Sequence, residues 1–462
     1  MANTNILMKG PDRGNLPVTE VLAFPGAEGL AANTRGAAGY SGTPNVAIVD
    51  TLANSGTGSL REAVTGSGKE GTFVTFTVSG IINLTSRCDI TSDYITIAGQ
   101  TSPGGICLAG YGLFVGNSSN SVSHVIMRHI RMRVGSHEAG GTSDNDAFRV
   151  SQSYNIMMDH CSFSWGGDEV ADAPDGTNPC KAVTFNKCIL TQGLEDPADE
   201  ADHNYGMLLP WGGDGNIDNS LNYHECLLSD CRRRFPTMQG DGFVQMTNCV
   251  TYNWDRFYNT VIQRIGTDVE WNHISNYAKG GPNGTSAAGE MNGHSSLSGP
   301  YEMLYMLNNF GERRTVAADG EWCITDYGTG NLLSTGWQSA TPFTLPEGKD
   351  PTVTTLNTNE ATAEAQVLAL MEDWGATKPF RDQVDTDAIN RFDNNIDGWL
   401  ANTTYPGDWP TYATPAAPTD SNGDGIPDEF ETGRGFGVGS MNPFDTAPSG
   451  YLWIEEYANS LA

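Results

Sequence analysis

The chain is poor in basic residues and contains no long hydrophobic run. It has 25 Lys and Arg against 55 Asp and Glu in 462 residues, which gives a formal net charge of −30 and a pI near 4.4. Proteins that bind nucleic acids or anionic membranes carry basic surfaces, so this balance argues against both partners. No stretch approaches the roughly 18–20 apolar residues of a membrane span. A polyanionic substrate would need a local device, such as a bound cation or an arginine cluster, to overcome the charge of the protein.

The sequence also begins without an apolar leader, and its number of cysteines is odd. Residues 1–22 indicate a flexible lead-in, and they lack the apolar core of a secretory signal peptide. Because 55 Gly and 17% charged residues are typical of a turn-rich extracellular protein, we expect secretion after loss of a leader, or release on a virion as the alternative. Nine Cys is an odd number, so at least one is unpaired.

What the chain does contain is a repeated strand pattern. Short segments of the form apolar-x-apolar-polar-polar-(Ile or Cys)-x recur every roughly 23–38 residues, a period within the range of solenoid coils. They cover 94–99, 125–131, 156–162, 183–189, 221–227, 244–250 and 269–275. The polar pair marks a bend between two strands, and a coil that cannot bury its own apolar face must stack on its neighbours. The pattern predicts an all-β fold, a parallel β-helix.

Four cysteines fall at the same inward position of this pattern. They are Cys161, Cys188, Cys226 and Cys249. The repeat predicts that these residues form a ladder of buried thiols. A metal site is disfavoured because the CxxC spacing of thiolate sites is absent.

Helix signals mark both ends of the solenoid. Ser59, followed by Glu62, predicts a capped short helix that closes the N-terminal end of the core. Residues 361–374 and 381–392 indicate two helices after the repeats end. We therefore expect four parts: a lead-in (1–22), a β-helix catalytic domain (23–345), a helical and linker segment packed on the solenoid (346–418) and a tail (419–462).

The stretch from Asp144 to Asp172 carries two pairs of carboxylates. Asp144 and Asp146 are two residues apart, and side chains two residues apart on a strand point to the same face of the sheet. Asp168 and Asp172 follow on the next segment. Four oxygen ligands from neighbouring segments suit Ca²⁺, which binds six to eight oxygens. The alternative is a set of solvated acidic residues.

A second acidic motif lies in the tail. Its spacing matches a calcium loop with ligands at positions 1, 3, 5, 9 and 12. These positions are Asp420, Asn422, Asp424, Asp428 and Glu431. Gly425 stands at the sharp turn, and Ile426 offers its carbonyl. We expect a structural Ca²⁺ site here.

Three consecutive arginines interrupt the acidic composition. Arg232, Arg233 and Arg234 precede Phe235 and Pro236. One interpretation is charge balance against the acidic loop at 195–200. The other is a positive patch that faces an anionic sugar polymer beside a bound cation.

Taken together, the motifs resemble those of pectate lyases of polysaccharide lyase family 1. The matching segments are FPGAEG (24–29), GQTSPGG (99–105), VIMR (125–128), DNDA (144–147), MDHCSFSW (158–165) and RFP (234–236). The resemblance runs from about Phe24 to the C-terminus.

This resemblance implies a right-handed parallel β-helix that cleaves (1→4)-α-D-galacturonan by Ca²⁺-dependent β-elimination. It implies that Asp144, Asp146, Asp168 and Asp172 bind Ca²⁺, with Glu169 as a substitute. It also implies that Arg234 is the base that removes the C5 proton. Arg normally has a pKa above about 12, so neighbouring cations must lower the pKa of Arg234.

The chain departs from the family pattern at two places. Gln239 stands where such lyases carry a second Arg, and residues 203–207 stand where they carry a Lys. We expect substrate contacts from Arg232, Arg233, His203, Tyr205 and Gln239, although His203 and Tyr205 also fit a packing role. The alternatives are a lyase acting on another uronate polymer, a trimeric tailspike depolymerase, a glycoside hydrolase, and a non-catalytic carbohydrate-binding β-helix. We expect a monomer.

Overall fold

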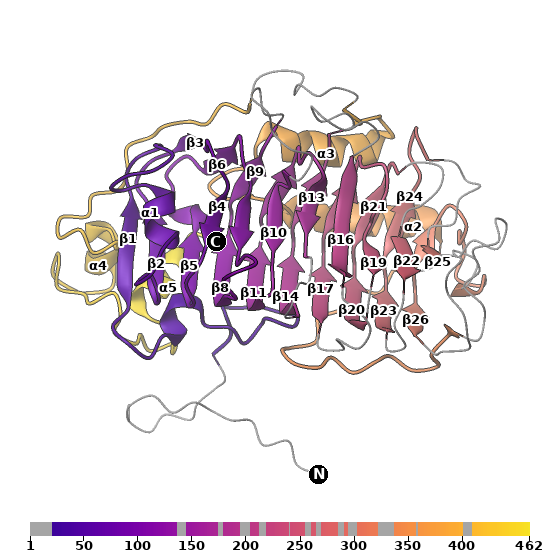
Figure 1. Cartoon of the computed structure of the whole chain (residues 1–462), viewed down its shortest axis with the longest axis horizontal. Coiled ribbons are helices and arrows are strands. Elements are labelled where there is room, and N and C mark those ends of the chain that lie inside the picture. Colours follow the sequence, from indigo (N-terminus) through magenta and orange to yellow (C-terminus); the bar gives the residue numbers. More distant parts are fainter. Residues whose placement is uncertain are drawn as a thin grey trace, which may run out of the picture.

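The chain folds into a parallel β-helix, whose coils stack along one long axis (Figure 1). The computed structural model describes residues 21–135, 145–173, 179–194, 204–211, 219–239, 241–254, 260–264, 269–284, 291–293, 303–321, 337–356, 359–400 and 409–462. Strands of neighbouring coils pair in parallel, as predicted. Within these ranges, none of the helices has the length and apolar character that a membrane crossing requires.

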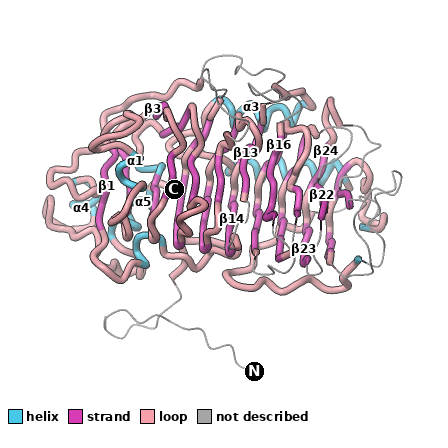
Figure 2. The backbone as a smooth tube through the Cα atoms, in the orientation of Figure 1, coloured by secondary structure: helices cyan, strands magenta, loops and turns pink. Residues whose placement is uncertain are grey.

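The strands of the described residues form three sheets that run along the solenoid (Figure 2). The β1–β26 sheet has the order β1 (Asn45–Val49), β2 (Thr72–Phe76), β5 (Ile95–Ala98), β8 (Ser123–Arg128), β11 (Tyr154–Asp159), β14 (Lys181–Asn186), β17 (Ser220–His224), β20 (Gly242–Thr247), β23 (Val269–Ile274) and β26 (Leu304–Leu307). The β4–β25 sheet has the order β4 (Cys88–Ile90), β7 (Leu113–Val115), β10 (Phe148–Val150), β13 (Glu169–Asp172), β16 (Tyr205–Trp211), β19 (Thr237–Gln239), β22 (Thr260–Arg264) and β25 (Met291–Gly293). The β3–β27 sheet has the order β3 (Gly80–Asn83), β6 (Ile106–Ala109), β9 (Arg131–Arg133), β12 (Ser162–Ser164), β15 (Ile189–Thr191), β18 (Leu227–Ser229), β21 (Val250–Tyr252), β24 (Tyr277–Lys279) and β27 (Phe310–Gly311).

The polar pairs of the repeat form the bends between the β1–β26 sheet and the β3–β27 sheet. The second residue of the pair adopts the left-handed conformation in five successive coils, with φ between 51° and 54°. These residues are His129, His160, Lys187, Glu225 and Asn248. Because one left-handed residue reverses the alternation of side chains, the chain turns a corner and the next residue points inward again.

The predicted ladder of thiols is confirmed. The register of β12, β15, β18 and β21 aligns the residue that precedes each strand. Cys161, Cys188, Cys226 and Cys249 occupy these positions, and all four are free and fully buried. Burial raises the pKa of Cys161 to about 12, so the thiol stays protonated inside the core.

The helix predicted at the N-terminal end is also present. It is α1 (Leu60–Val64), and the Ser59 hydroxyl accepts a hydrogen bond from the Glu62 amide at 3.2 Å. Leu60 and Val64 are buried in the same cluster as the interior side chains of the first coils. The helix therefore closes the core where no preceding coil covers it.

Two helices after the repeats cover the outer face of the β3–β27 sheet. They are α2 (Glu360–Leu370), extended by a 3₁₀ turn at Met371–Asp373, and α3 (Gln383–Asn394). Apolar side chains of the helices, among them Val367 and Phe392, pack against outward side chains of the strands, among them Tyr252 and Tyr277. Both predicted helices are thus present. The helix α2 begins one residue before its predicted start, and α3 begins two residues after its predicted start.

A buried ionic network joins α3 to the same sheet. Arg133 on β9 donates from Nη2 to Asp382 at 3.0 Å and to Asp385 at 2.6 Å, and all three side chains are buried. The Tyr412 hydroxyl donates to Asp382 at 2.8 Å. Arg131 lies 3.9 Å from Asp382 and donates to backbone carbonyls of the segment before α3. Burial raises the pKa of Asp385, and Arg133 opposes that rise.

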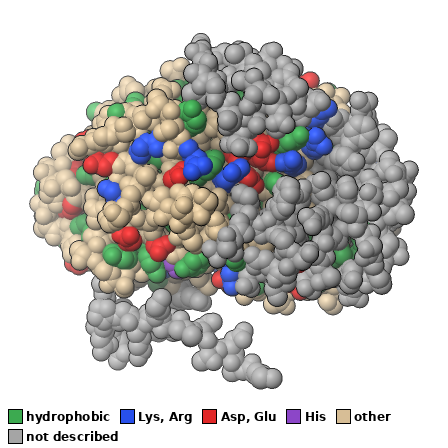
Figure 3. Space-filling model, in the orientation of Figure 1, with side chains coloured by type: hydrophobic (Ala, Val, Ile, Leu, Met, Phe, Trp, Pro, Cys, Tyr) green, Lys and Arg blue, Asp and Glu red, His purple; other side chains and the backbone are tan. Residues whose placement is uncertain are grey.

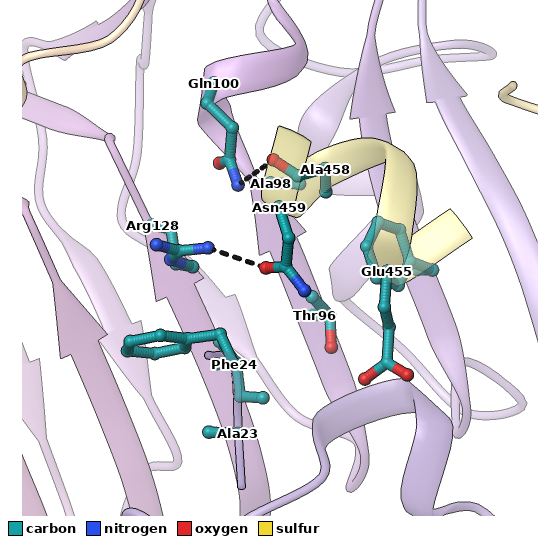
Figure 4. A pocket seen from close by; sticks show the side chains of 11 residues that line it. Ala23, Phe24, Thr96, Ala98, Gln100, Arg128, Glu455, Ala458 and Asn459 are labelled. Atoms are coloured by element: carbon teal, nitrogen blue, oxygen red, sulfur yellow. Dashed lines mark hydrogen bonds between the residues drawn. The ribbon is translucent and has the colours of Figure 1, made fainter. Parts of the chain in front are cut away.

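The C-terminal tail returns to the first coils. It contains α4 (Asp428–Gly433) and α5 (Trp453–Ser460), whose apolar residues pack with Phe73 and Ala98 on the β1–β26 sheet. Figure 4 shows the contact of α5: Gln100 donates to the Ala458 carbonyl at 3.3 Å, and Arg128 donates to the Asn459 side chain at 3.0 Å. The tail thereby covers the outer face of the N-terminal coils.

Candidate active site

The candidate site lies on the outer face of the β4–β25 sheet, where three neighbouring strands present polar side chains. Phe148 on β10 pairs with Ala171 on β13, and Ala171 pairs with Met207 on β16. All three are fully buried in the core of the solenoid. Because side chains alternate along a strand, the flanking residues Arg149 and Asp172 lie on the outer face.

Three carboxylates converge at the start of β13. Asp146, Asp168 and Glu169 each offer one oxygen, and these oxygens all lie within 4.8 Å of one another. Asp146 and Glu169 are buried, whereas Asp168 is partly exposed. The Asp146 carboxylate also accepts a hydrogen bond from the Glu169 amide at 3.0 Å, which fixes the two segments together. Asp144, the first residue of the predicted set, lies outside the described residues.

Asp172 belongs to the same acidic surface but is held by an arginine. Arg149 lies 2.6 Å from Asp146 and 3.0 Å from Asp172, so one guanidinium bridges both carboxylates. Burial and the nearby Asp146 charge hold the pKa of Asp172 well above its ordinary value, although Arg149 opposes them. Sequence reasoning missed Arg149. Its signal would have been the strand register that places it opposite Asp172.

The arginine segment leads into β19, two coils beyond β13, and lies against β16. The Gly206 amide donates to the Arg233 carbonyl at 2.9 Å, and the Met207 amide donates to the Arg234 carbonyl at 2.7 Å. A Cβ atom at Gly206 would lie 2.4 Å from the Arg234 carbonyl oxygen, so only glycine permits this approach. Arg234 itself has φ 70°, a left-handed conformation that directs its side chain away from the regular strand direction.

Arg234 contacts the acidic group directly. Its guanidinium touches the Glu169 carboxylate and lies 3.9 Å from the centre of the Tyr205 ring. Burial lowers the pKa of Arg234 from its ordinary value, while the charges of Asp168 and Asp146 act in the opposite direction. The structure therefore places a partly buried guanidinium with a lowered pKa beside three carboxylates.

The other predicted binding residues have different positions. Arg233 donates to the Tyr205 hydroxyl at 2.9 Å, and its guanidinium lies 4.8 Å from the centre of the Tyr205 ring. Tyr205 therefore contacts the guanidinium groups of both Arg233 and Arg234. The Arg232 amide donates to the Asn204 carbonyl at 2.7 Å. His203 lies outside the described residues, as does the side chain of Gln239 at the end of β19.

Three of the predicted ligands of the tail loop form hydrogen bonds within the loop. The Asp420 carboxylate accepts hydrogen bonds from the amides of Gly423 and Gly425, and Asn422 donates to Asp424 at 2.8 Å. Burial raises the pKa of Asp424, and the charges of Asp420 and Glu431 add to that rise.

Two further positions of this loop have protein partners. Glu431 is buried and accepts hydrogen bonds from the amides of Gly439 and Met441, and Asp428 accepts two from Ser421. In the described part of the chain, the carboxylates of the loop form no group of three within 4.8 Å.

A second group of potential ligands is buried in the bends of the solenoid. His129, Asp159 and His160 lie within the same 4.8 Å limit. Asp159 already contacts Arg128 at 2.7 Å and Asn186 at 2.7 Å. The two imidazole rings are stacked, with centres 5.0 Å apart and an interplanar angle of 27°. Since ligand lone pairs lie in the ring planes, stacked rings are poorly directed toward a shared metal ion.

No family model matches the chain. Among solved structures, similar folds include a pectate lyase from Bacillus sp. N165 in complex with trigalacturonate (15% identity, TM-score 0.46, covering 76% of this chain and 98% of that one). Another is a Bacillus subtilis pectate lyase mutant (13% identity, TM-score 0.48, 79% and 100% covered).

Curated relatives align over nearly the whole chain. The probable pectate lyase C of Aspergillus flavus is 31% identical over 447 residues, which cover 96% of this chain and 94% of the relative. The probable pectate lyase C of Emericella nidulans is 31% identical over 452 residues, with 96% and 93% covered. This level of identity over both full lengths shows that the chain belongs to the pectate lyase family of polysaccharide lyases.

Proposed function

We propose that this protein cleaves (1→4)-α-D-galacturonan by Ca²⁺-dependent β-elimination and releases 4,5-unsaturated oligogalacturonides. The observation that carries the proposal is the contact between Arg234 and an acidic group of three carboxylates on neighbouring coils. Membership of the pectate lyase family supports it. A hydrolase would use two carboxylates as acid and base and would give no role to Arg234.

The acidic group fits a bound Ca²⁺. Asp146, Asp168 and Glu169 supply oxygen donors from two segments, and Asp172 and Asp144 are near enough in sequence to complete the set. The raised pKa of Asp172 supports this fit, because closely spaced buried carboxylates favour either a proton or a cation. When bound, Ca²⁺ would withdraw electron density from a uronate carboxylate and offset the charges of Asp146 and Asp168.

Arg234 is the base in this proposal. Burial favours its neutral form, and the Tyr205 ring fixes the plane of its guanidinium. Neutral Arg234 takes the proton from C5, the electron pair of that C–H bond forms the C4–C5 double bond, and the C4–O bond breaks. The leaving oxygen takes a proton from water and becomes the new chain end.

The remaining arginines bind the polymer. Arg233 is oriented by its hydrogen bond to Tyr205, and Arg232 is adjacent to it on the same turn. A guanidinium presents paired donors to a carboxylate, which suits the uronate groups of the substrate. His203 and Gln239 are proposed to complete the binding surface in place of the Lys and the second Arg of the family pattern.

The proposal also includes the setting of the enzyme. We propose action outside the cell, since a galacturonan polymer is itself extracellular material, and we propose that the protein acts as a monomer. A second Ca²⁺ in the tail loop would be structural, because that loop packs on the first coils through Ile426 and not beside Arg234.

The experiment is an absorbance assay for unsaturated uronide with polygalacturonate, first with Ca²⁺ and then with chelator. We expect product with Ca²⁺ only, and a loss of turnover of at least about a hundredfold in Arg234→Lys with the fold intact, since an ammonium cannot reproduce the guanidinium. Arg434→Lys, at an exposed arginine of the tail, is the matched control. New reducing ends without absorbance would mean hydrolysis, and near-wild-type Arg234→Lys would remove Arg234 from the mechanism.

A further inference from the structure

On the N-terminal side of the candidate site, one aromatic ring lies between Arg87 and Arg149, the arginine that also contacts Asp146 and Asp172. Phe114 on β7 is an outward residue, paired with Asp89 on β4 and with Arg149 on β10. The guanidinium of Arg87 lies 4.8 Å from the Phe114 ring centre, and that of Arg149 lies 5.2 Å from it. The ring is only 3% exposed, so the two cations cover an aromatic group on the outer face of the sheet.

Arg87 is held in place although its side chain is 48% exposed. Its Nε and Nη2 atoms donate to the two oxygens of Asp89 at 2.6 and 2.9 Å. Arg61 donates to the backbone carbonyls of Ser86 at 2.7 Å and of Arg87 at 2.6 Å, which fixes the turn that carries Arg87. The remaining terminal nitrogen, Nη1, donates to no described residue, and an incoming anion can approach it while Asp89 stays bound.

The position of Arg87 continues the line of the candidate site. Neighbouring strands lie about 4.8 Å apart, so β4 is about 14 Å from β13 along the solenoid axis. Figure 3 shows Lys and Arg side chains in a row across the middle of this face, over the region of β4 to β16, with acidic side chains between them. In a chain of net charge −30, such a row is a local path for a polyanion.

Stability does not account for this arrangement. An exposed ion pair such as Arg87 with Asp89 contributes roughly 0–1 kcal/mol, because water screens it and two long side chains must be ordered. The restraint of Arg87 by three separate groups is instead the preorganisation that a binding site requires.

We infer that Arg87, together with Phe114 and Arg149, forms an additional binding site for a uronate carboxylate of the substrate, on the N-terminal side of the acidic group. This inference rests on the proposed function, because it takes the polymer cleaved at Arg234 as its ligand. The site contacts a part of the substrate polymer that is distant from the bond that breaks. It therefore adds affinity for long substrates and leaves the chemical step to the residues already described.

The test compares long and short substrates in wild type and Arg87→Gln. With polygalacturonate, KM rises about tenfold, the size expected for one lost charge-assisted hydrogen bond, while kcat is retained. With a trimer too short to reach β4, KM does not change. Lys349→Gln removes an equally exposed, ion-paired cation elsewhere on the molecule and serves as the control for net charge.

Direct binding separates this inference from the proposed function. Calorimetric titration of hexagalacturonate into both proteins without Ca²⁺ measures affinity in the absence of cleavage. If wild type produces no unsaturated uronide but Arg87→Gln still weakens binding tenfold, the proposed function fails and the binding site stands. Equal affinity of the two proteins, or a KM change that is the same for trimer and polymer, overturns the inference.

Discussion

Replacing Arg133 with Met tests how the helical segment is attached to the solenoid. The side chain of Arg133 is fully buried and contacts Asp382 and Asp385. After its loss, Asp382 keeps Arg131 and Tyr412 as partners, but Asp385 loses its ion pair. Removing one partner of a buried ion pair costs about 3–5 kcal/mol, because the other charge remains buried without compensation. We expect a loss of that size in the free energy of unfolding.

The pH dependence of this loss has a definite sign. Burial already raises the pKa of Asp385, and without Arg133 nothing described opposes that rise as strongly. The folded variant therefore keeps Asp385 protonated above the pKa of the unfolded chain, which is about 3.9. The free energy of unfolding of Arg133→Met is therefore closest to that of wild type near or below that pH, and it falls further behind as the pH rises toward neutrality.

Urea unfolding followed by tryptophan fluorescence gives the free energies, and hydrogen exchange over Gln383–Asn394 shows whether α3 detaches first. Arg133→Met with Asp385→Leu should recover most of the loss, because an apolar pair replaces the ionic one. Arg434→Met, which removes an exposed ion pair, should cost less than about 1 kcal/mol. A loss below about 1 kcal/mol in Arg133→Met, or a double variant less stable than the single one, would refute the reasoning.

Two further predictions concern the tail loop and the arginine turn. Chelation should lower the Tm of wild type more than that of Asp420→Ala, because the variant keeps only the cation proposed at the acidic group, and a cation at a hundred times its Kd adds about 2.7 kcal/mol to the stability of the native state. Gly206→Ala should reduce kcat/KM by about a hundredfold and also lower the Tm, since a Cβ would displace the Arg234 backbone carbonyl and shift the base.

Each of these has a matched control. Asp350→Ala removes an exposed carboxylate outside the loop and should keep the response to chelator. Gly320→Ala introduces a methyl group where no atom lies within 4 Å, and its activity should equal that of wild type. An unchanged chelator response in Asp420→Ala would exclude the loop as the structural cation site. Full activity in Gly206→Ala would show that the turn tolerates the shift.

The fold could be predicted from the sequence because one pattern repeats in register. The polar pair and the inward Cys or Ile identify the bend of five central coils without knowledge of distant contacts. At 269–275 the predicted bend was wrong by two residues, because the left-handed residue is Ser275 and Asn276, not Ile274, stands at the inward position. The coil at β26 and β27 was not among the predicted segments, because Leu307 stands in place of the first polar residue and Asn309 at the inward position. The first strands were also missed, since β2 reads as a continuous buried run with no polar pair.

The sequence predicts part of the geometry of the candidate site, for a physical reason. Asp146 and Asp168 carry local motifs, and the structure brings them beside Arg234. Arg149 has no such motif, since its position depends on the register between β10 and β13, which are separated along the chain by β11 and β12. The Arg133 network likewise pairs residues about 250 positions apart, and no local spacing reveals that two arginines on a strand are fully buried.

The return of the tail changes how this solenoid must assemble. In a simple solenoid each coil contacts only its neighbours, so unfolding can start at an end and spread. Here Arg35 pairs with Glu455 at 2.8 Å, a contact between residues 420 positions apart. During synthesis the first coils leave the ribosome before the C-terminal tail that covers them. Their outer apolar face therefore stays exposed until the tail has been made. Such long-range contacts raise the contact order, which slows folding, and they give the finished molecule no loose N-terminal coil from which unwinding could begin.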